Sequence, residues 1–135
     1  MHKLIALREA GAGVADIAAL LAEQVEFNSP VLSRGIVGRA AVAQAMVAAV
    51  AVRQGAYVAE MSDGPITLLV WRGTVDGLPL DSFEMLRHDE HGLIVERSVA
   101  MRPFASALRF RNAFFRRMGD QLGPEYFALD ELPLG

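Results

Sequence analysis

The first half of the chain carries hydrophobic residues at helical spacing, interrupted by glycine and proline. The pattern predicts a short helix over residues 4–10, a second over 17–21, and an alanine-rich third helix over 39–54. Residues 25–29 predict a short extended segment, because Pro30 fits neither a helix interior nor a central strand. The stretch between Pro30 and the third helix is predicted to be a loop.

The second half changes to an alternating pattern. Strands are predicted over 57–61, 66–72, 80–88 and 93–102, separated by short turn-forming segments, so we expect an antiparallel meander. Pro103 suits the first turn of a final helix. Its apolar stripe is expected to contain Phe104, Leu108, Phe115 and Met118. This order of elements predicts an α+β domain with helices against one face of a curved sheet.

The turn at residues 89–92 predicts which side chains share a face of the last hairpin. If His88 lies opposite Leu93, Glu84 lies directly opposite Arg97. The residues expected on this face are Ser82, Glu84, Leu86 and His88. If helices cover the face, Glu84 and Arg97 form an ion pair in a partly dry pocket, where they can orient polar ligand groups. The alternative is a solvent-exposed salt bridge on the rim of the sheet.

Composition narrows the class of protein. The chain has 135 residues, 53% of them hydrophobic, a net charge of −3 and no cysteine. These values exclude a mainly disordered chain, disulfides and thiolate sites, and argue against general binding to nucleic acid or anionic membranes. The longest apolar stretch, 40–52, is shorter than the roughly 20 residues that span a bilayer. We therefore expect a cytoplasmic protein with no nucleic-acid or membrane partner.

Three other groups of residues allow a chemical interpretation. His88 and His91 have ligand-type side chains, but they flank a tight turn, so a solvated turn is favoured and no metal or cofactor is predicted. His88 alone is a candidate acid or base at a pocket mouth, or a partly exposed strand end. Ser29 as a nucleophile would need His88 as its base. The arginines of the last helix are expected on its outer face.

Several short segments stand in an order that is typical of one superfamily. They read Val-Glu-Phe-Asn-Ser-Pro at 25–30, Gly-Arg at 38–39, Glu-Met-Leu-Arg at 84–87, Asp-Glu-His-Gly-Leu-Ile at 89–94 and Met-Arg-Pro at 101–103. With these segments the chain resembles the nuclear transport factor 2-like superfamily, especially its ketosteroid isomerase and SnoaL-like (polyketide cyclase) branches. The resemblance implies a domain over 1–120 and a tail over 121–135. It also implies a cone-shaped, mixed or antiparallel sheet wrapped around about three helices, the cystatin-like roll.

The resemblance also implies where catalytic groups would stand. In the isomerase branch the general base precedes the proline of the first strand, which is Ser29 here. The tyrosine of the first helix falls on Ile5, and the second acid falls on Glu84. Since serine is no base near pH 7 and isoleucine offers no donor, steroid isomerase activity is not expected. Epoxide-hydrolase relatives hold an arginine between two acids, of which Glu84 with Arg97 supplies one half.

Three hypotheses for function follow. The first is a small-molecule-binding protein of unassigned reaction, whose ligand is apolar with one polar group. The second is a cyclase-, isomerase- or epoxide-hydrolase-type enzyme that uses Glu84 with Arg97 and His88. The third is an interaction module with a filled cavity, which a cavity below about 300 Å³ would favour. The expected pocket residues are Phe27, Ser29, Met46, Val50, Leu86, Val99, Met101, Phe104 and Leu108. A homodimer is expected through the outer sheet face at Trp71, Phe83 and Met85.

Overall fold

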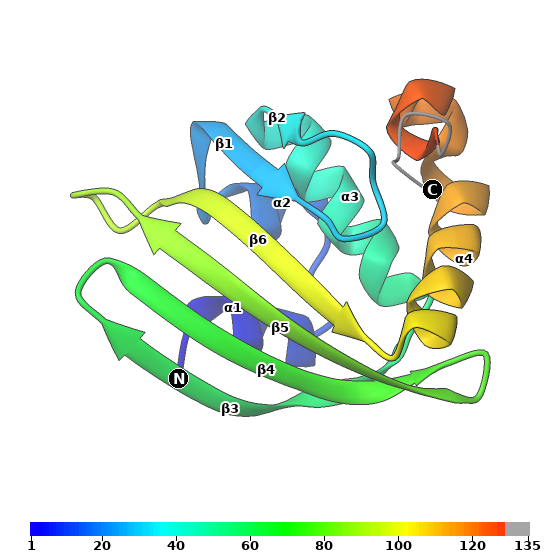
Figure 1. The fold of residues 1–135 in the computed structure, drawn as a ribbon. Coiled ribbons are helices and arrows are strands. Elements are labelled where there is room, and N and C mark those ends of the chain that lie inside the picture. The colour runs from blue at the N-terminus through cyan, green and yellow to red at the C-terminus, as the bar shows by residue number, and fades with distance from the viewer. Residues whose placement is uncertain (129–135) are drawn as a thin grey trace.

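The computed structural model describes residues 1–128 and has the predicted α+β architecture. In chain order its elements are α1 (Lys3–Glu9), α2 (Val14–Ala18), β1 (Leu21–Asn28), β2 (Ile36–Val37), α3 (Arg39–Ala51), β3 (Gln54–Asp63), β4 (Ile66–Val75), β5 (Leu78–His88), β6 (Ile94–Arg102), α4 (Phe104–Leu122) and the 3-10 helix η1 (Pro124–Phe127). The six strands form one sheet in the order β2-β1-β6-β5-β4-β3. Helices α1 to α3 lie on one face of this curved sheet, and α4 follows β6 at one end (Figure 1).

The meander from β3 to β6 is antiparallel throughout, as the short turns predict. Strand β1 instead runs parallel to β6, so the sheet is mixed. The second helix ends at Ala18, earlier than expected, because Leu21 already belongs to β1 and is buried beneath the helices. The predicted loop contains β2, which pairs with β1.

The register between β5 and β6 differs from the expected one by two residues. Leu86 lies opposite Arg97, and Glu84 lies opposite Val99, so the prediction of Glu84 directly opposite Arg97 is wrong. Because the difference is an even number of residues, every side chain keeps its expected face. Glu84 and Arg97 are therefore diagonal neighbours on the inner face.

The turn explains this difference. A bulge after Arg87 pairs His88 with Ile94 instead of Leu93. The Asp89 carboxylate accepts hydrogen bonds from two backbone N–H groups of the turn, including that of Leu93 at 2.9 Å. Such an Asx turn lengthens the connection, and the sequence alone does not specify how many residues it takes up.

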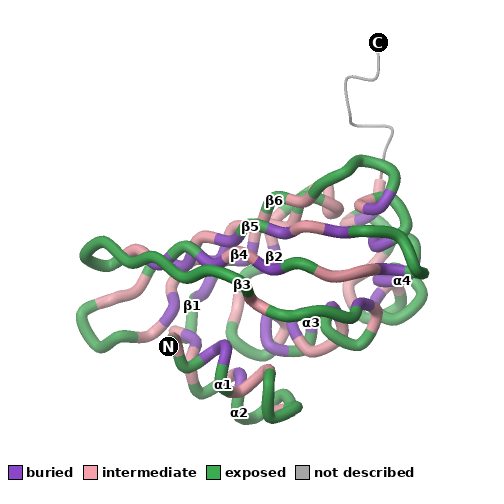
Figure 2. The backbone as a smooth tube through the Cα atoms, turned by 90° about the horizontal axis from the view of Figure 1, so that it is seen from below, coloured by how far each residue is buried: buried purple, intermediate pink, exposed green. Residues whose placement is uncertain are grey.

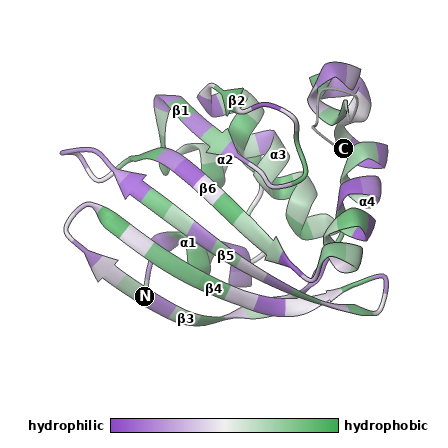
Figure 3. Ribbon diagram, viewed as in Figure 1, coloured by the Kyte–Doolittle hydropathy of each residue, from purple (hydrophilic) through white to green (hydrophobic). Residues whose placement is uncertain are grey.

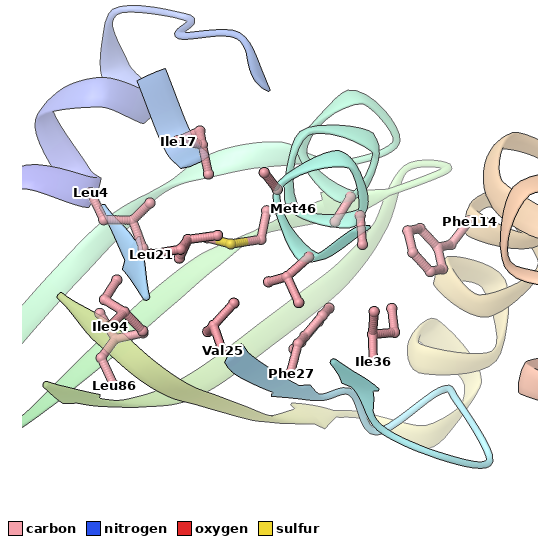
Figure 4. Close-up of a cluster of buried hydrophobic side chains, with 14 of the residues drawn as sticks. Leu4, Ile17, Leu21, Val25, Phe27, Ile36, Met46, Leu86, Ile94 and Phe114 are labelled. Atoms are coloured by element: carbon pink, nitrogen blue, oxygen red, sulfur yellow. The ribbon is translucent and has the colours of Figure 1, made fainter. Parts of the chain in front are cut away.

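The core lies between the inner sheet face and the helices. Figure 4 shows Leu4 of α1, Leu21 of β1 and Met46 of α3 meeting in this layer, above Leu86 and Ile94 of the meander. All five side chains are at most 1% exposed. In Figure 2 buried residues recur along the central strands and α3, while much of β3 is exposed.

Helix α4 packs through a different face from the expected one. Its buried residues are Ser106, Phe110, Ala113, Phe114 and Met118. Phe104 is 82% exposed and Leu108 is 41% exposed, so the predicted stripe is wrong except at Met118. The helix has hydrophobic residues on two sides, and the contacts with α3 and η1 decide which side is buried. Phe115 lies on the other side, with its ring 4.8 Å from that of Phe127.

The outer face of the β4–β5 hairpin is apolar and has no helix over it. It presents Leu68, Val70, Phe83 and Met85, and Figure 3 shows how hydrophobic residues run along β4. Trp71 points the other way and is 5% exposed, which corrects the expectation that it lies on this outer face. The alternation along β4 requires this, since Leu69 and Trp71 share the covered side.

The start of the expected tail packs against the domain. Phe127 of η1 is buried against the ring of Phe114. The rest of the predicted tail, residues 129–135, lies outside the described residues. Within residues 1–128, no helix has both the length and the apolar character needed to cross a membrane.

Candidate functional site

A buried ion pair occupies the inner face of the sheet. The Nε of Arg97 on β6 donates to Oε2 of Glu84 on β5 at 2.6 Å, and the two residues are 2% and 3% exposed. The Arg97 guanidinium also lies 4.7 Å from the centre of the Phe27 ring on β1. Three neighbouring strands thus hold this pair in a dry setting, where a charge-assisted hydrogen bond is strong.

Three further polar side chains surround the pair. Arg8 comes from α1, Arg53 from the connection between α3 and β3, and Tyr57 from β3. Nη1 of Arg8 donates to the Met46 carbonyl oxygen, and Nη1 of Arg53 donates to the Ser82 hydroxyl, both at 3.3 Å. We call Arg8, Arg53, Tyr57, Glu84 and Arg97 the polar cluster.

Several atoms of the polar cluster are buried without a hydrogen-bond partner in the described part of the chain. They are Nε and Nη2 of Arg8, Nε of Arg53, the hydroxyl of Tyr57 and Oε1 of Glu84, none of which has a partner in good hydrogen-bond geometry. The Tyr57 hydroxyl nevertheless lies near enough to Glu84 and Arg8 to stabilise the charge of each. Buried polar groups in folded proteins are almost always hydrogen-bonded. A cluster with this many unpartnered atoms is therefore suited to bind a polar molecule.

Trp71 forms a platform for Arg53. The guanidinium carbon of Arg53 lies 4.3 Å from the centre of the indole ring, a cation–π contact. Gly55 and Gly73 lie opposite each other on β3 and β4 beside this ring. A Cβ atom on either glycine would come within 2.5 Å of the indole. The two glycines therefore leave the space in which Trp71 lies against the strands.

Burial and mutual charge set the ionisation of the polar cluster. Burial, with the Arg8 and Arg97 charges, lowers the pKa of Arg53 to about 10, so Arg53 is still cationic at neutral pH. Burial and the Glu84 carboxylate raise the pKa of Tyr57 to about 12. Burial also lowers the pKa of Arg8. For Glu84 burial raises the pKa, but Arg97 and the other cations outweigh it, and the net pKa is lowered.

Two cavities each contact at least two members of the polar cluster, and Arg53 lines both. A surface hollow of about 250 Å³ near the end of α3 touches the cluster at Arg53 alone. The larger of the two cavities has a volume of about 100 Å³ and lies between α1, the end of α3 and the start of β3. It is lined by Arg8, Glu9, Val50, Arg53, Gly55, Ala56, Tyr57 and Trp71. The smaller has about 10 Å³, which is room for about one water molecule, and contacts Arg97.

The predicted pocket residues fall into three groups. Phe27, Ser29, Val99 and Met101 line the smaller cavity, and Val50 lines the larger one. Met46 and Leu86 are fully buried in the core and line neither of these two cavities. Phe104 and Leu108 lie on the solvent side of α4, which corrects the expectation that they line a pocket.

His88 lies away from Ser29 and is bonded to the N-terminal segment. Its Nε2 is 2.9 Å from Nε2 of His2, and its Nδ1 is 2.9 Å from the Pro65 carbonyl oxygen. The Ser29 hydroxyl accepts a hydrogen bond from the backbone N–H of Val31 at 3.3 Å. The structure therefore does not bring Ser29 and His88 together as nucleophile and base. Ile5 is buried in the core.

Arg8, Arg53 and Tyr57 were not predicted from the sequence. One signal for Arg8 was present, because it follows Leu4 and Ile5 at a spacing that places it on the buried side of the first helix. A charged residue on the buried face of a helix needs a polar or charged contact in the interior, so its position predicts such a contact. Arg53 and Tyr57 offered no comparable signal. Arg53 lies in the connection between α3 and β3, and Tyr57 lies in β3 next to an irregularity in its pairing with β4, so the direction of each side chain depends on the whole sheet.

The comparisons with known proteins identify the fold. No protein-family model and no curated protein matches the chain. Among solved structures, an uncharacterized protein with a cystatin-like fold from Silicibacter pomeroyi is similar at 29% identity, covering 90% of this chain and 89% of that one, with a TM-score of 0.81. A steroid delta-isomerase from Pseudomonas aeruginosa is similar at 23% identity, covering 89% of each chain, with a TM-score of 0.82.

A third solved structure is described as a nuclear transport factor 2-like protein of unknown function, from Mesorhizobium loti. It is 19% identical, covers 75% of this chain and 86% of that one, and has a TM-score of 0.67. Together these structures confirm the nuclear transport factor 2-like, cystatin-like fold that the sequence resemblance implied.

Proposed function

We propose that this nuclear transport factor 2-like chain binds a small molecule in the larger cavity, beside the polar cluster. The observation that carries the proposal is one cavity of about 100 Å³ that combines an indole wall with buried polar atoms of Arg8, Arg53 and Tyr57 that lack well-formed hydrogen bonds. Ligand sites characteristically combine apolar walls with a few convergent polar groups. A molecule with complementary groups would complete the hydrogen bonds that the described residues leave open.

The size of the cavity limits the ligand. Pockets for drug-sized molecules usually exceed about 300 Å³. With about 100 Å³, the site suits a molecule of few non-hydrogen atoms, or the head of a longer one that continues past Glu9 and Ala56 into solvent. The sequence predicts an apolar ligand with one polar group, and the cavity volume adds that the bound part of this ligand is small.

Glu84 fits a structural role better than a catalytic one. Its lowered pKa means that it is ionised at neutral pH and is a weak base. Within residues 1–128 the structure pairs Arg97 with this one acid and with no second one. These features argue against a SnoaL-like cyclase, isomerase or epoxide-hydrolase reaction built on Glu84 and Arg97. We assign Glu84 the role of holding the guanidinium groups in place.

A fragment screen tests the binding proposal. Neutral and charged molecules of up to about ten non-hydrogen atoms would be added to the labelled protein, and amide chemical shifts would be recorded. We expect shifts around Arg53 and Tyr57, and their loss in Val50→Trp, which fills the cavity. Val37→Trp, on the exposed side of β2, is the matched control. Failure of every fragment to shift these resonances would refute the proposal.

A second proposal concerns the outer sheet face, which we propose joins two copies of the chain. Leu68 is 44% exposed and Phe83 is 41% exposed, and Val70 and Met85 lie beside them. Contiguous exposed apolar patches on a folded domain mark interaction sites. A largely filled interior is also what the interaction hypothesis expects.

Light scattering after size exclusion tests the dimer. The unaltered chain should elute with twice its monomer mass, and Met85→Arg should elute as a monomer. Val37→Arg introduces the same charge on an outward-facing strand residue away from the patch, and should leave the mass at that of the dimer. A monomeric unaltered chain, or a dimeric Met85→Arg variant, would exclude this face.

A further inference from the structure

We infer that the group which the larger cavity recognises is a carboxylate, bound by Arg8 and Arg53 together. This inference rests on the proposed small-molecule site and names the class of its ligand. It is carried by the charges of the polar cluster, by the guanidinium edges that lack partners, and by the residues that line the cavity.

The charges of the polar cluster do not balance. Its members include three arginines, Arg8, Arg53 and Arg97, and one carboxylate, that of Glu84. Glu84 is ion-paired with Arg97, so the two arginines that line the larger cavity have no acid bonded to them in the described residues. A buried cation without a counter-charge costs free energy. An anion in the cavity would offset this cost.

The free edges of the two guanidinium groups have the geometry of a carboxylate site. Arg8 uses Nη1 for the Met46 carbonyl, while Nε and Nη2, whose N–H groups lie along one edge of the guanidinium group, are buried and have no partner in good hydrogen-bond geometry among the described residues. The nearby Tyr57 hydroxyl stabilises the Arg8 cation, but it is neutral and supplies no counter-charge. Two parallel N–H groups on one edge match the two oxygens of a carboxylate. Arg53 uses Nη1 for Ser82 and adds its unpartnered Nε.

Arg53 is fixed in place before any ligand binds. It is 7% exposed, and the Trp71 platform and the Ser82 hydroxyl restrain its guanidinium from two directions. Gly55 and Gly73 in turn leave the space for the indole. A preorganised cation loses little conformational entropy on binding, which favours recognition over a merely structural role.

The acids near the cavity select among anions. Glu9 lines the cavity and is exposed, and Glu84 lies within the polar cluster with one free oxygen. These negative charges oppose a dianion more than a monoanion. Val50 and Trp71 offer an apolar surface, so the expected ligand is a small carboxylic acid with a short aliphatic or aromatic group.

Matched pairs of probes test this inference. Acetate, propionate and benzoate would be titrated against acetamide, propionamide and benzamide, with inorganic phosphate as the other anion, by calorimetry and by fluorescence of Trp71, the one tryptophan of the chain. Hydrogen bonds to charged groups predict that a carboxylate binds at least about tenfold more tightly than its amide, and more tightly than phosphate.

Variants separate recognition from structure. Arg53→Met keeps the length of the side chain and removes the charge, so it should lose the carboxylate preference while the unliganded protein becomes at least as heat-stable. Arg8→Met should lose the preference as well. Arg72→Met, on the outer face of β4, is the matched control and should keep it. If Arg53→Met does not fold, the carboxylate preference of the unaltered protein and its loss in Arg8→Met test the inference.

The outcomes distinguish the two proposals. Equal binding of amides and carboxylates, abolished by Val50→Trp, would leave the small-molecule site standing and overturn the carboxylate inference. Tighter binding of phosphate, or a carboxylate preference that survives in Arg53→Met and Arg8→Met, would also overturn it. No binding of either probe class to the unaltered protein would refute the proposed site itself.

Discussion

The two faces of the β4–β5 hairpin differ in a way that stability alone does not explain. The covered face contains Ser82 and Glu84, a hydroxyl and a carboxylate, in the dry interior. The uncovered face presents Leu68, Phe83 and Met85. The rest of the covered face is apolar, with Leu69, Trp71, Leu80 and Leu86. The buried hydroxyl and carboxylate and the exposed apolar side chains are therefore the exceptions on each face. These exceptions are what the two proposals explain, a small-ligand site on the inner face and an interface between copies on the outer one.

The largest effect is expected from separating the buried ion pair. Glu84→Leu leaves Arg97 buried without its counter-charge, and Arg97→Met leaves the carboxylate in the same position. Each should cost about 3–5 kcal/mol of unfolding free energy, because removing one partner of a buried pair leaves an uncompensated charge. Urea unfolding would measure this.

The double variant Glu84→Leu with Arg97→Met tests whether the inner face needs the ion pair in order to fold. It replaces the pair with apolar side chains of similar size, so it should lose less stability than either single variant. A double variant as unstable as the sum of the two would show that the inner face needs this pair to fold, and would weaken the functional interpretation of its polarity.

The next effect concerns the Trp71 platform. Gly55→Ala would place a Cβ 2.3 Å from the Arg72 carbonyl oxygen and 2.5 Å from the indole, so the strand or the ring must move. We expect a loss of about 1–3 kcal/mol, typical of overpacking, together with a shifted Trp71 emission maximum. Gly13→Ala is the control, since its Cβ would meet no atom within 4 Å. Unchanged emission in Gly55→Ala would contradict the platform.

A smaller effect is expected on the outer face, and it should depend on protein concentration. Phe83→Ser removes an exposed apolar side chain next to Glu84 in sequence. In dilute protein its unfolding temperature should equal that of the unaltered chain, while in concentrated protein it should show a stability lower by about 1 kcal/mol through lost association. A deficit that does not change with concentration would show that Phe83 stabilises the monomer instead.

Alternation explains how much of the fold and the site the sequence could predict. The period of two along β5 and β6 is a local property, and it assigned Glu84 and Arg97 to one face even though the register was wrong by two residues. The register depends on how many residues the Asp89 turn takes up, and the alternation of residues in the strands does not specify this number. The same limit applies to Trp71, whose hydrophobicity suited an outer interface while its position in β4 required the inner face.

The polar cluster shows why the remainder could not be predicted. Arg8 and Arg53 are 45 positions apart, and no local pattern indicates that α1 and the end of α3 meet. They line one cavity because α1 docks against α3, where Arg8 donates to the Met46 carbonyl oxygen, and this long-range docking cannot be read from the strand pattern. The orientation of helix α4 could not be predicted for the same reason. The helix has hydrophobic residues on two sides, and long-range contacts with α3 and η1 decide which side is buried.

His2, the N-cap of α1, lies within hydrogen-bond distance of His88 at the end of β5. His88 Nδ1 faces the Pro65 carbonyl oxygen, which only accepts, so this nitrogen carries the hydrogen and Nε2 accepts. His2 Nδ1 accepts from the backbone N–H of Leu4 at 3.0 Å, as the N-cap of α1, so His2 Nε2 donates to His88. A proton added to Nδ1 of His2 would place two donors face to face, since that nitrogen accepts from the Leu4 backbone N–H.

The smallest expected effect is therefore a loss of stability in mild acid, transmitted to the inner face through α1. Burial, with His88 adding to it, lowers the pKa of His2 below 6.5. A base whose pKa is lowered by folding contributes stability that is present above about pH 6.5 and is lost as the pH falls through the folded value. Unfolding temperatures from pH 7.5 to 5 should fall more steeply for the unaltered chain than for His2→Asn, which still caps the helix but does not titrate. His91→Asn, on the exposed turn, should keep the steep slope. Acidification should also be visible at the larger cavity, because α1 carries both the His2 cap and Arg8. Lowering the pH should shift the amide resonances of residues around this cavity and leave those of the outer sheet face unchanged. Equal slopes for the unaltered chain and His2→Asn would show that the histidine pair does not couple protonation to the inner face.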